Sequence, residues 1–145
     1  MTSTHFPTSS TPPTTPSATP DTLARLALKL DAAVTGLNGL AYLALAQVLD
    51  SFFGIEAAVQ YPVGAFLLLY ATAVLVIATR EHISRPALSA VITANLLWTV
   101  LSVISVATDT FSPTGTGMAW ALLQALVVAG FAAVQYVALG RLHRS

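Results

Sequence analysis

Long stretches without a charged residue dominate the chain after residue 31. Four such stretches contain 18, 23, 23 and 31 residues, and they cover 32–49, 57–79, 86–108 and 110–140. A helix crosses the hydrocarbon core of a membrane, about 30 Å thick, with about 20 mostly apolar residues. The pattern therefore predicts an all-α fold, an integral membrane bundle of four transmembrane helices. We place the four spans near 29–50, 61–79, 87–107 and 117–140.

The beginning of the chain has a different composition, because Thr, Ser and Pro make up most of residues 1–20. Such a segment buries too little apolar surface to offset the entropy of ordering, so we expect a disordered tail there. It also lacks the basic start and the apolar centre of a signal peptide. The transmembrane domain is expected to cover 21–145, with a helix capped by Asp21 that continues into the first span.

Prolines and glycines mark the expected helix ends. Pro62 and Pro86 lie where the first turns of the second and third spans are expected, a position that tolerates a missing N–H. Gly140 closes the fourth apolar stretch. A faint similarity between 33–38 and 90–95, at an offset of 57 residues, leaves open that the chain is two helical hairpins in tandem.

Composition and charge narrow the function classes. Hydrophobic residues make up 55% of the 145 residues and charged residues only 8%, whereas a soluble domain carries about 25% charged residues. The formal net charge of zero argues against a nucleic-acid partner, which needs a basic face. The absence of Cys excludes disulfides, iron–sulfur clusters and thiol chemistry.

The distribution of charge predicts the orientation. If the N-terminus is inside, one side of the membrane holds all six basic residues, which are Arg25, Lys29, Arg80, Arg85, Arg141 and Arg144. The other side holds acidic Asp50, Glu56 and Asp109. Because basic residues concentrate in cytoplasmic loops, we expect a plasma-membrane protein with both termini in the cytoplasm.

Polar residues within the spans are the candidate functional residues, since a polar group in a bilayer is costly. Helical periodicity gives three spans a polar stripe, and we expect the stripes to meet inside the bundle. The candidates for this polar interior or ligand pocket are Asp31, Thr35, Asn38, Asn95, Trp98, Gln124 and Gln135.

Three interpretations of these residues stay open. The side-chain amides either join the helices as packing contacts, or line a pocket that is open to the cytoplasmic leaflet and binds a small molecule or lipid headgroup. In both cases Asn38 and Asn95 are expected to face each other or a shared partner. A proton or ion relay would have to centre on Asp31, which we expect near the membrane surface beside Arg25 or Lys29.

Small residues recur on two spans and predict close helix packing. Gly117, Ala121, Ala125, Ala129 and Ala133 repeat every four positions. The pairs Ala32/Gly36 and Thr35/Gly39 have the same spacing on the first span. Such spacing lets backbones approach closely, and we expect most of these contacts within one chain.

Familiar catalytic and cofactor patterns are absent from the sequence. It has no Gly-rich phosphate loop, no Ser-His-Asp arrangement and no paired carboxylates, so we expect neither an enzyme nor a cofactor. The histidines His5, His82 and His143 all lie outside the predicted spans, which argues against bilayer haem. His82 and His143 with nearby Glu81 are a weak metal signal, and solvated loop residues are the simpler interpretation.

Three segments carry a resemblance to a known class of protein. They are 30–43 (LDAAVTGLNGLAYL), 94–98 (ANLLW) and 124–132 (QALVVAGFA). With them, residues 28–140 resemble small four-span integral membrane proteins common in actinobacteria. The resemblance implies the fold and the topology, and it transfers no activity and no site residue. Small multidrug transporters also have four spans, but they need a membrane-embedded Glu in the first span. The first span of this chain has only Asp31, at its edge, so the resemblance to these transporters fails.

Two functions follow from these expectations. The first is a non-enzymatic accessory or scaffold subunit of a larger membrane complex, in which the chain contacts the lipid bilayer and other subunits or further copies of itself. The alternative is a small carrier or binding protein for a lipid-like or apolar solute. It would work through the region of Asn38, Asn95 and Gln135.

Overall fold

The computed structural model describes residue 1 and residues 20–142, and the regular secondary structure in that part is entirely α-helical. The tail prediction lies almost wholly outside the described residues. Five helices follow one another along the chain: α1 (Pro20–Ala44), α2 (Ala46–Phe53), α3 (Ala57–Thr79), α4 (Arg85–Ala107) and α5 (Gly115–Leu142).

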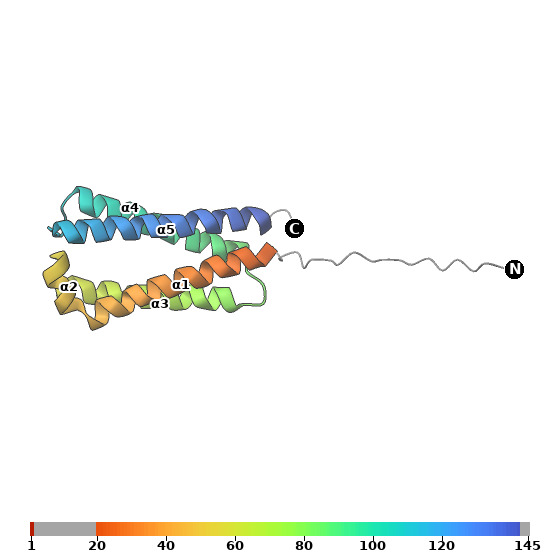
Figure 1. Cartoon of the computed structure of the whole chain (residues 1–145), viewed down its shortest axis with the longest axis horizontal. Helices are drawn as coiled ribbons and strands as arrows, with labels where there is room; N and C mark the ends of the chain where they lie inside the picture. Colours follow the sequence, from red (N-terminus) through yellow and green to blue (C-terminus); the bar gives the residue numbers. More distant parts are fainter. Residues whose placement is uncertain (2–19, 143–145) are drawn as a thin grey trace.

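The long helices form two antiparallel pairs that lie side by side (Figure 1). Helix α1 packs mainly on α3, α4 packs on α5, and contacts between α1 and α5 join the two pairs. Helices α3 and α4 touch each other at few residues. The bundle therefore has three well-packed sides and a loosely packed side between α3 and α4.

The predicted spans are confirmed in part. Helices α3, α4 and α5 are each long and apolar enough to cross a membrane, and α1 with α2 meets the same test as a bent pair. The prediction of one continuous first span to residue 50 is wrong, because α1 ends at Ala44 and α2 turns away from it by 95°. Phe53 at the end of α2 stacks on Trp120 of α5, with ring centroids 5.6 Å apart, and this contact holds α2 across the bundle.

Helix ends also differ from the expectation at one proline. Pro62 lies inside α3, because the helix begins at Ala57, four residues before the expected start at 61. The carboxylate of Asp50 accepts a hydrogen bond from the Ala57 N–H at 3.1 Å and so stabilises the earlier start. The prediction for Pro86 is confirmed, since it lies in the first turn of α4 behind the N-cap Ser84. Helix α5 continues beyond Gly140.

Small residues bring α1 and α3 into backbone contact. A Cβ on Gly39 would lie 2.9 Å from the Gly64 carbonyl oxygen, and a Cβ on Gly64 would lie 2.9 Å from the Gly39 carbonyl oxygen. Gly36 faces the Ala71 side chain in the same interface. A Cβ on Gly117 of α5 would lie closer still to the carbonyl oxygen of Phe53. These contacts confirm close packing within one chain for the first span. For the stripe of the fourth span the expectation holds in part, since Gly117 and Ala125 are buried but Ala133 is exposed.

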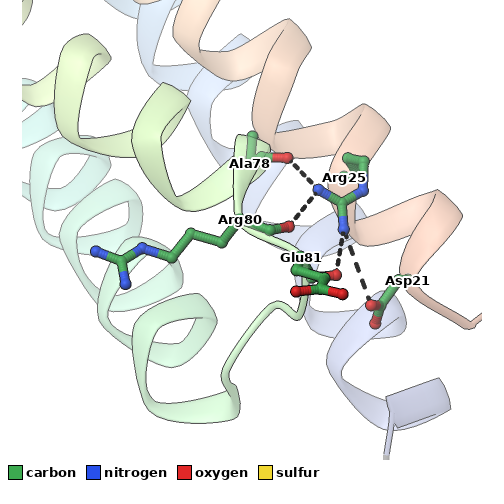
Figure 2. Close-up of polar contacts among 5 residues, drawn as sticks. All are labelled: Asp21, Arg25, Ala78, Arg80 and Glu81. Atoms are coloured by element: carbon green, nitrogen blue, oxygen red, sulfur yellow. Dashed lines mark hydrogen bonds and ion pairs between the residues drawn. The ribbon is translucent and has the colours of Figure 1, made fainter.

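The basic residues of the described chain gather at one end of the bundle. At this end α1 begins, α3 and α5 end, and α4 begins (Figure 1). The guanidinium of Arg25 donates hydrogen bonds to the carbonyl oxygens of Ala78, Arg80 and Glu81, and its distance to the Asp21 carboxylate is 3.9 Å (Figure 2). Arg25 thus neutralises the exposed carbonyls at the C-terminus of α3.

The apolar core lies next to this basic end. Its members come from the first half of α1, the last half of α3, the first half of α4 and the end of α5. Leu28, Val74, Leu88 and Ala138 are among the fully buried side chains. The four long helices are therefore closely packed at the basic end, and any interior space has to lie beyond this core.

Candidate ligand-binding cavity

A cluster of buried polar side chains lies directly beyond the apolar core. We call it the Asp31 cluster, and its members are Asp31, Thr35, Tyr70, Asn95 and Gln135. Asp31 and Gln135 are fully buried. Asp31 Oδ2 accepts hydrogen bonds from Asn95 Nδ2 at 2.7 Å and Gln135 Nε2 at 2.8 Å, and Asp31 Oδ1 accepts one from Thr35 Oγ1 at 3.1 Å.

The hydrogen bonds of the Asp31 cluster all run toward one carboxylate. Tyr70 Oη donates to Asn95 Oδ1 at 2.9 Å, and Asn95 Nδ2 donates in turn to Gln135 Oε1 at 3.1 Å as well as to Asp31. Both oxygens of Asp31 therefore take part in the network. Four helices contribute one network, because α1, α3, α4 and α5 each supply a member.

Asp31 is inside the bundle, and its predicted place at the surface beside Arg25 or Lys29 is wrong. It lies six residues beyond Arg25, about 9 Å along α1. The Arg25 guanidinium is bound to carbonyl oxygens at the end of α3, and Lys29 is exposed. Across residues 20–142, no basic side chain pairs with the Asp31 carboxylate. Its hydrogen-bond partners among the described residues are all neutral side chains.

A second polar cluster lies further along the bundle, away from the basic end. We call it the Gln124 cluster, and its members are Asn38, Tyr42, Trp120 and Gln124. Gln124 Nε2 donates to Asn38 Oδ1 and to Tyr42 Oη, each at 3.1 Å. Trp120 Nε1 donates to the same Tyr42 hydroxyl at 3.1 Å. This cluster joins α1 to α5 only.

The expected pairing of Asn38 with Asn95 is wrong, although both side chains do point inward. Asn95 belongs to the Asp31 cluster and Asn38 to the Gln124 cluster. Asn38 lies seven residues beyond Asp31 on α1, about 10 Å along the helix, so the two asparagines occupy different levels. The polar stripes do meet inside the bundle, but in two layers.

A cavity of about 570 Å³ lies between the two layers and between the two helix pairs. It is lined by all four long helices, and most of its wall is apolar. Thr35, Tyr70 and Asn95 form its polar end toward the basic side, and Asn38 and Gln124 line it further along. Its other lining residues are Val34, Leu37, Ala41, Phe66, Leu67, Ala94, Leu97, Trp98, Leu101, Trp120, Leu123, Val127 and Val128.

The position of this cavity corrects the expected pocket. The apolar core closes the bundle at its basic end, so the cavity extends from the Asp31 cluster toward the acidic end and not toward the basic one. Asp31 itself does not line the cavity. It is hydrogen-bonded to Thr35 and Asn95, and these two residues lie between it and the cavity. Of the sequence candidates, Thr35, Asn38, Asn95, Trp98 and Gln124 line the wall.

An aromatic group on the loosely packed side of the bundle was not expected from the sequence. Phe66 of α3 stacks on Trp98 of α4 with ring centroids 6.1 Å apart, and it also stacks on Tyr70 at 6.4 Å. Trp98 lies on the predicted polar stripe of its span. Phe66 has no such signal, because one aromatic residue in an apolar helix does not reveal which neighbour it meets.

Two buried or partly buried polar residues, Tyr70 and Gln60, were not among the candidates from the sequence. Tyr70 is one of few polar residues in its span, and it joins the Asp31 cluster, whereas Thr72 donates to the Leu68 carbonyl of its own helix. Gln60 is buried where α2 meets α3, and its Nε2 donates to the carbonyl oxygens of Ala46 and Ile55. Gln60 therefore stabilises the bend between α1 and α3 and lies outside the cavity lining.

The residues that could hold a metal ion are few. Within residues 20–142, no group of three or more His, Asp or Glu side chains comes together. His82 is exposed in the loop between α3 and α4, while His5 and His143 lie outside the described residues.

The cavity, with its apolar wall and its polar end, suits noncovalent binding of a small, mostly apolar molecule with one polar group.

Comparisons with protein-family models, with curated proteins and with solved structures gave no match. The resemblance to small four-span actinobacterial proteins therefore stays a prediction, and the case for a function rests on the cavity and its two polar clusters.

Proposed function

We propose that the protein is a multi-pass membrane protein that binds a mostly apolar, lipid-like solute in the cavity between its two helix pairs. The observation that carries this proposal is the cavity itself, about 570 Å³ in volume and lined by α1, α3, α4 and α5. Small-molecule sites typically measure about 300–1,000 Å³ and are mostly apolar with a few polar groups. Such sites also form between the helices of bundles.

The distribution of polar groups supports an amphipathic occupant. The hydroxyl and amide groups of Thr35, Tyr70 and Asn95 lie at one end of the cavity, and leucine and valine side chains cover most of the remaining wall. A solute with a polar head and an apolar body matches both regions. A wholly apolar solute would leave the polar end facing hydrocarbon, which is costly.

The loosely packed side supports entry from the bilayer. Helices α3 and α4 contact each other at few residues, and Phe66 and Trp98 meet there. Phe66, Leu97 and Leu101 line the cavity and are about half exposed to the surroundings of the bundle. A solute dissolved in the membrane can therefore reach the cavity between α3 and α4 without crossing water.

The orientation that fits this proposal has the basic end in the cytoplasm, since basic residues concentrate there. α1 with α2 then forms the first of four spans, and the chain is a plasma-membrane protein with both termini inside. The cavity lies toward the outer half of the bilayer, because the apolar core occupies the cytoplasmic half.

A photolabelling experiment tests the binding function. The full-length protein in lipid nanodiscs is irradiated with a neutral alkanol that carries a diazirine, and labelled peptides are mapped by mass spectrometry. We expect labels on the cavity segments 34–41, 94–101 and 120–128, and we expect unlabelled alkanol to compete saturably. Label spread evenly over lipid-facing residues, without saturation, would refute the proposal.

Two matched variants sharpen the test. Ala94→Phe places a ring in the cavity, because Ala94 lines it. Ala90→Phe adds the same ring to an exposed position one turn earlier on α4 that does not line the cavity. We expect Ala94→Phe to abolish saturable labelling and Ala90→Phe to preserve it.

The alternative of an accessory or scaffold subunit stays a prediction. It would show itself as stable co-purification with a larger complex. The same variants separate it from the binding function, since filling the cavity leaves the lipid-facing surface of the bundle unchanged.

A further inference from the structure

We infer that the cavity selects a cation: an apolar solute that carries one protonated amine, bound with its charge at the Asp31 cluster. This inference rests on the binding function proposed above and names the chemical class of the solute. It starts from the buried carboxylate of Asp31, which has three hydrogen-bond donors and, across residues 20–142, no basic partner.

A buried charge without a counter-charge is unusual in a protein. Buried charges are normally paired, because the neutral groups around them only partly replace the lost hydration. Within a bilayer, such residues mark sites for ions, protons or ligands. The Asp31 cluster is built to hold the negative charge, since its amides and hydroxyls donate toward Asp31 directly or through Asn95.

The charge of Asp31 reaches the cavity through two residues. Thr35 and Asn95 both donate to Asp31, and both line the cavity. A positive group in contact with Thr35 and Asn95 would be separated from the Asp31 carboxylate only by these side chains. The low dielectric of this interior weakens screening, so the attraction is stronger than between exposed charges. No basic residue lines the cavity to oppose it.

The hydrogen-bond chemistry of the polar end also favours an ammonium group. Thr35 Oγ1 and Tyr70 Oη each donate a hydrogen bond, and neither accepts one from the described residues. Their lone pairs can therefore accept from a ligand N–H. An anionic head would instead face these oxygens and the nearby carboxylate, which repel it.

The aromatic residues of the cavity wall also favour a positively charged ligand. Phe66, Tyr70, Trp98 and Trp120 all line the cavity. Cations are attracted to the faces of aromatic rings, and the attraction grows when water is excluded. The aromatic rings also offer flat apolar surface to the body of the solute, so one ligand can satisfy both parts of the wall.

Three naphthalene probes of similar size test the inference, because they differ mainly in charge. These are 1-naphthylmethylamine (cationic at neutral pH), 1-naphthalenemethanol (neutral) and 1-naphthylacetate (anionic). Binding to the full-length protein in phosphatidylcholine nanodiscs is measured by equilibrium dialysis, and uptake into empty nanodiscs is subtracted. We expect the cation to bind at least tenfold more tightly than the alcohol, and the acetate not to bind measurably.

Asp31→Asn removes the charge and keeps the size of the side chain. We expect it to weaken binding of the cation about tenfold or more, because the attraction between opposite charges in a low-dielectric interior is lost, and to leave the alcohol unchanged. The matched control is Asp109→Asn, which removes the same charge from an exposed loop. Asp109 has φ 50°, a conformation that Asn tolerates well, and the variant should bind all probes as the unmodified protein does.

The outcomes separate the two proposals. If the cation and the alcohol bind the unmodified protein equally, the selectivity for cations is wrong and the binding site stands. If neither probe binds in competition with the diazirine alkanol, the binding function is wrong as well. If Asp31→Asn fails to bind the alcohol as well, the substitution has damaged the whole site. The order of the three affinities in the unmodified protein then decides whether the cavity selects cations, because that comparison needs no variant.

The protonated amine can come from a free solute or from a lipid headgroup. Adding phosphatidylethanolamine to the nanodiscs distinguishes these sources. Weaker binding of the naphthyl cation would assign the site to a lipid amine, and unchanged binding would assign it to a free amine. Both results support a cation site.

Discussion

Replacing Asn95 with leucine removes a residue that connects three other members of the Asp31 cluster. Leucine branches at the same carbon and is somewhat larger, so the change deletes hydrogen bonds without leaving a cavity. Three side-chain hydrogen bonds are lost: one from Tyr70 at 2.9 Å, one to Gln135 at 3.1 Å and one to Asp31 at 2.7 Å. The loss also leaves the buried carboxylate with two donors in place of three.

The size of the effect follows from these bonds. Neutral hydrogen bonds between transmembrane helices contribute about 0.6 kcal/mol each, and a bond to a charged group contributes about 1.5–3 kcal/mol. Two neutral bonds and one to the carboxylate give a loss of about 3–4 kcal/mol for Asn95→Leu. Asn38→Leu should cost only about 0.6 kcal/mol, because Gln124 keeps Tyr42 as its partner.

Equilibrium unfolding in mixed micelles with increasing dodecyl sulfate measures both changes. The double variant of Asn38 and Asn95 should show additive effects within about 0.5 kcal/mol, since the two asparagines share no hydrogen-bond partner. The double variant of Asn95 and Gln135 should cost clearly less than the sum of its single changes, because these residues bond to each other. An effect of Asn95→Leu below about 1 kcal/mol, or strong coupling of Asn38 with Asn95, would refute the two-layer arrangement.

Three further predictions concern the packing, the basic end and the orientation. Gly39→Ala should destabilise the bundle by about 1–3 kcal/mol through overpacking against α3, whereas Gly130→Ala, with no atom within 4 Å of the added Cβ, should be neutral in the same unfolding assay. Arg25→Ala should cost about 1–2 kcal/mol because three carbonyl oxygens of the α3 terminus lose their donor; full stability of the alanine variant would show that water replaces the guanidinium. A reporter active only outside the cytoplasm should be silent when fused after Ser145 and active when inserted near Ser112, and an active fusion at the C-terminus would contradict the proposed orientation.

The sequence by itself determined the kind of fold and the inward-facing residues. Charge-free stretches of 23 residues or more predict long apolar helices, because a helix satisfies its backbone hydrogen bonds within one continuous segment. Helical periodicity correctly placed Thr35, Asn38, Asn95 and Gln124 toward the interior, since a turn of about 100° per residue is a local property. The spacing of small residues likewise predicted close contacts within the chain.

Only the tertiary structure decided which polar groups meet. Pairing depends on how far each helix is shifted along its neighbour, and no local pattern records that shift. This shift between helices places Asn38 and Asn95 at different levels, and it brings Tyr70 of α3 into contact with Asn95 of α4. The Gly39–Gly64 contact sets the register of α1 on α3, because bulkier residues would hold these backbones apart.

The burial of Asp31 is the clearest case of a property that the sequence could not give. In the sequence Asp31 lies next to Lys29 and close to Arg25, which favours an ion pair at the membrane surface. Arg25 instead binds the carbonyl oxygens where α3 ends, as Figure 2 shows, and it is therefore not available to Asp31. The carboxylate faces the amides of α4 and α5, because the direction of a side chain around a helix, and not its distance along the chain, selects its partners.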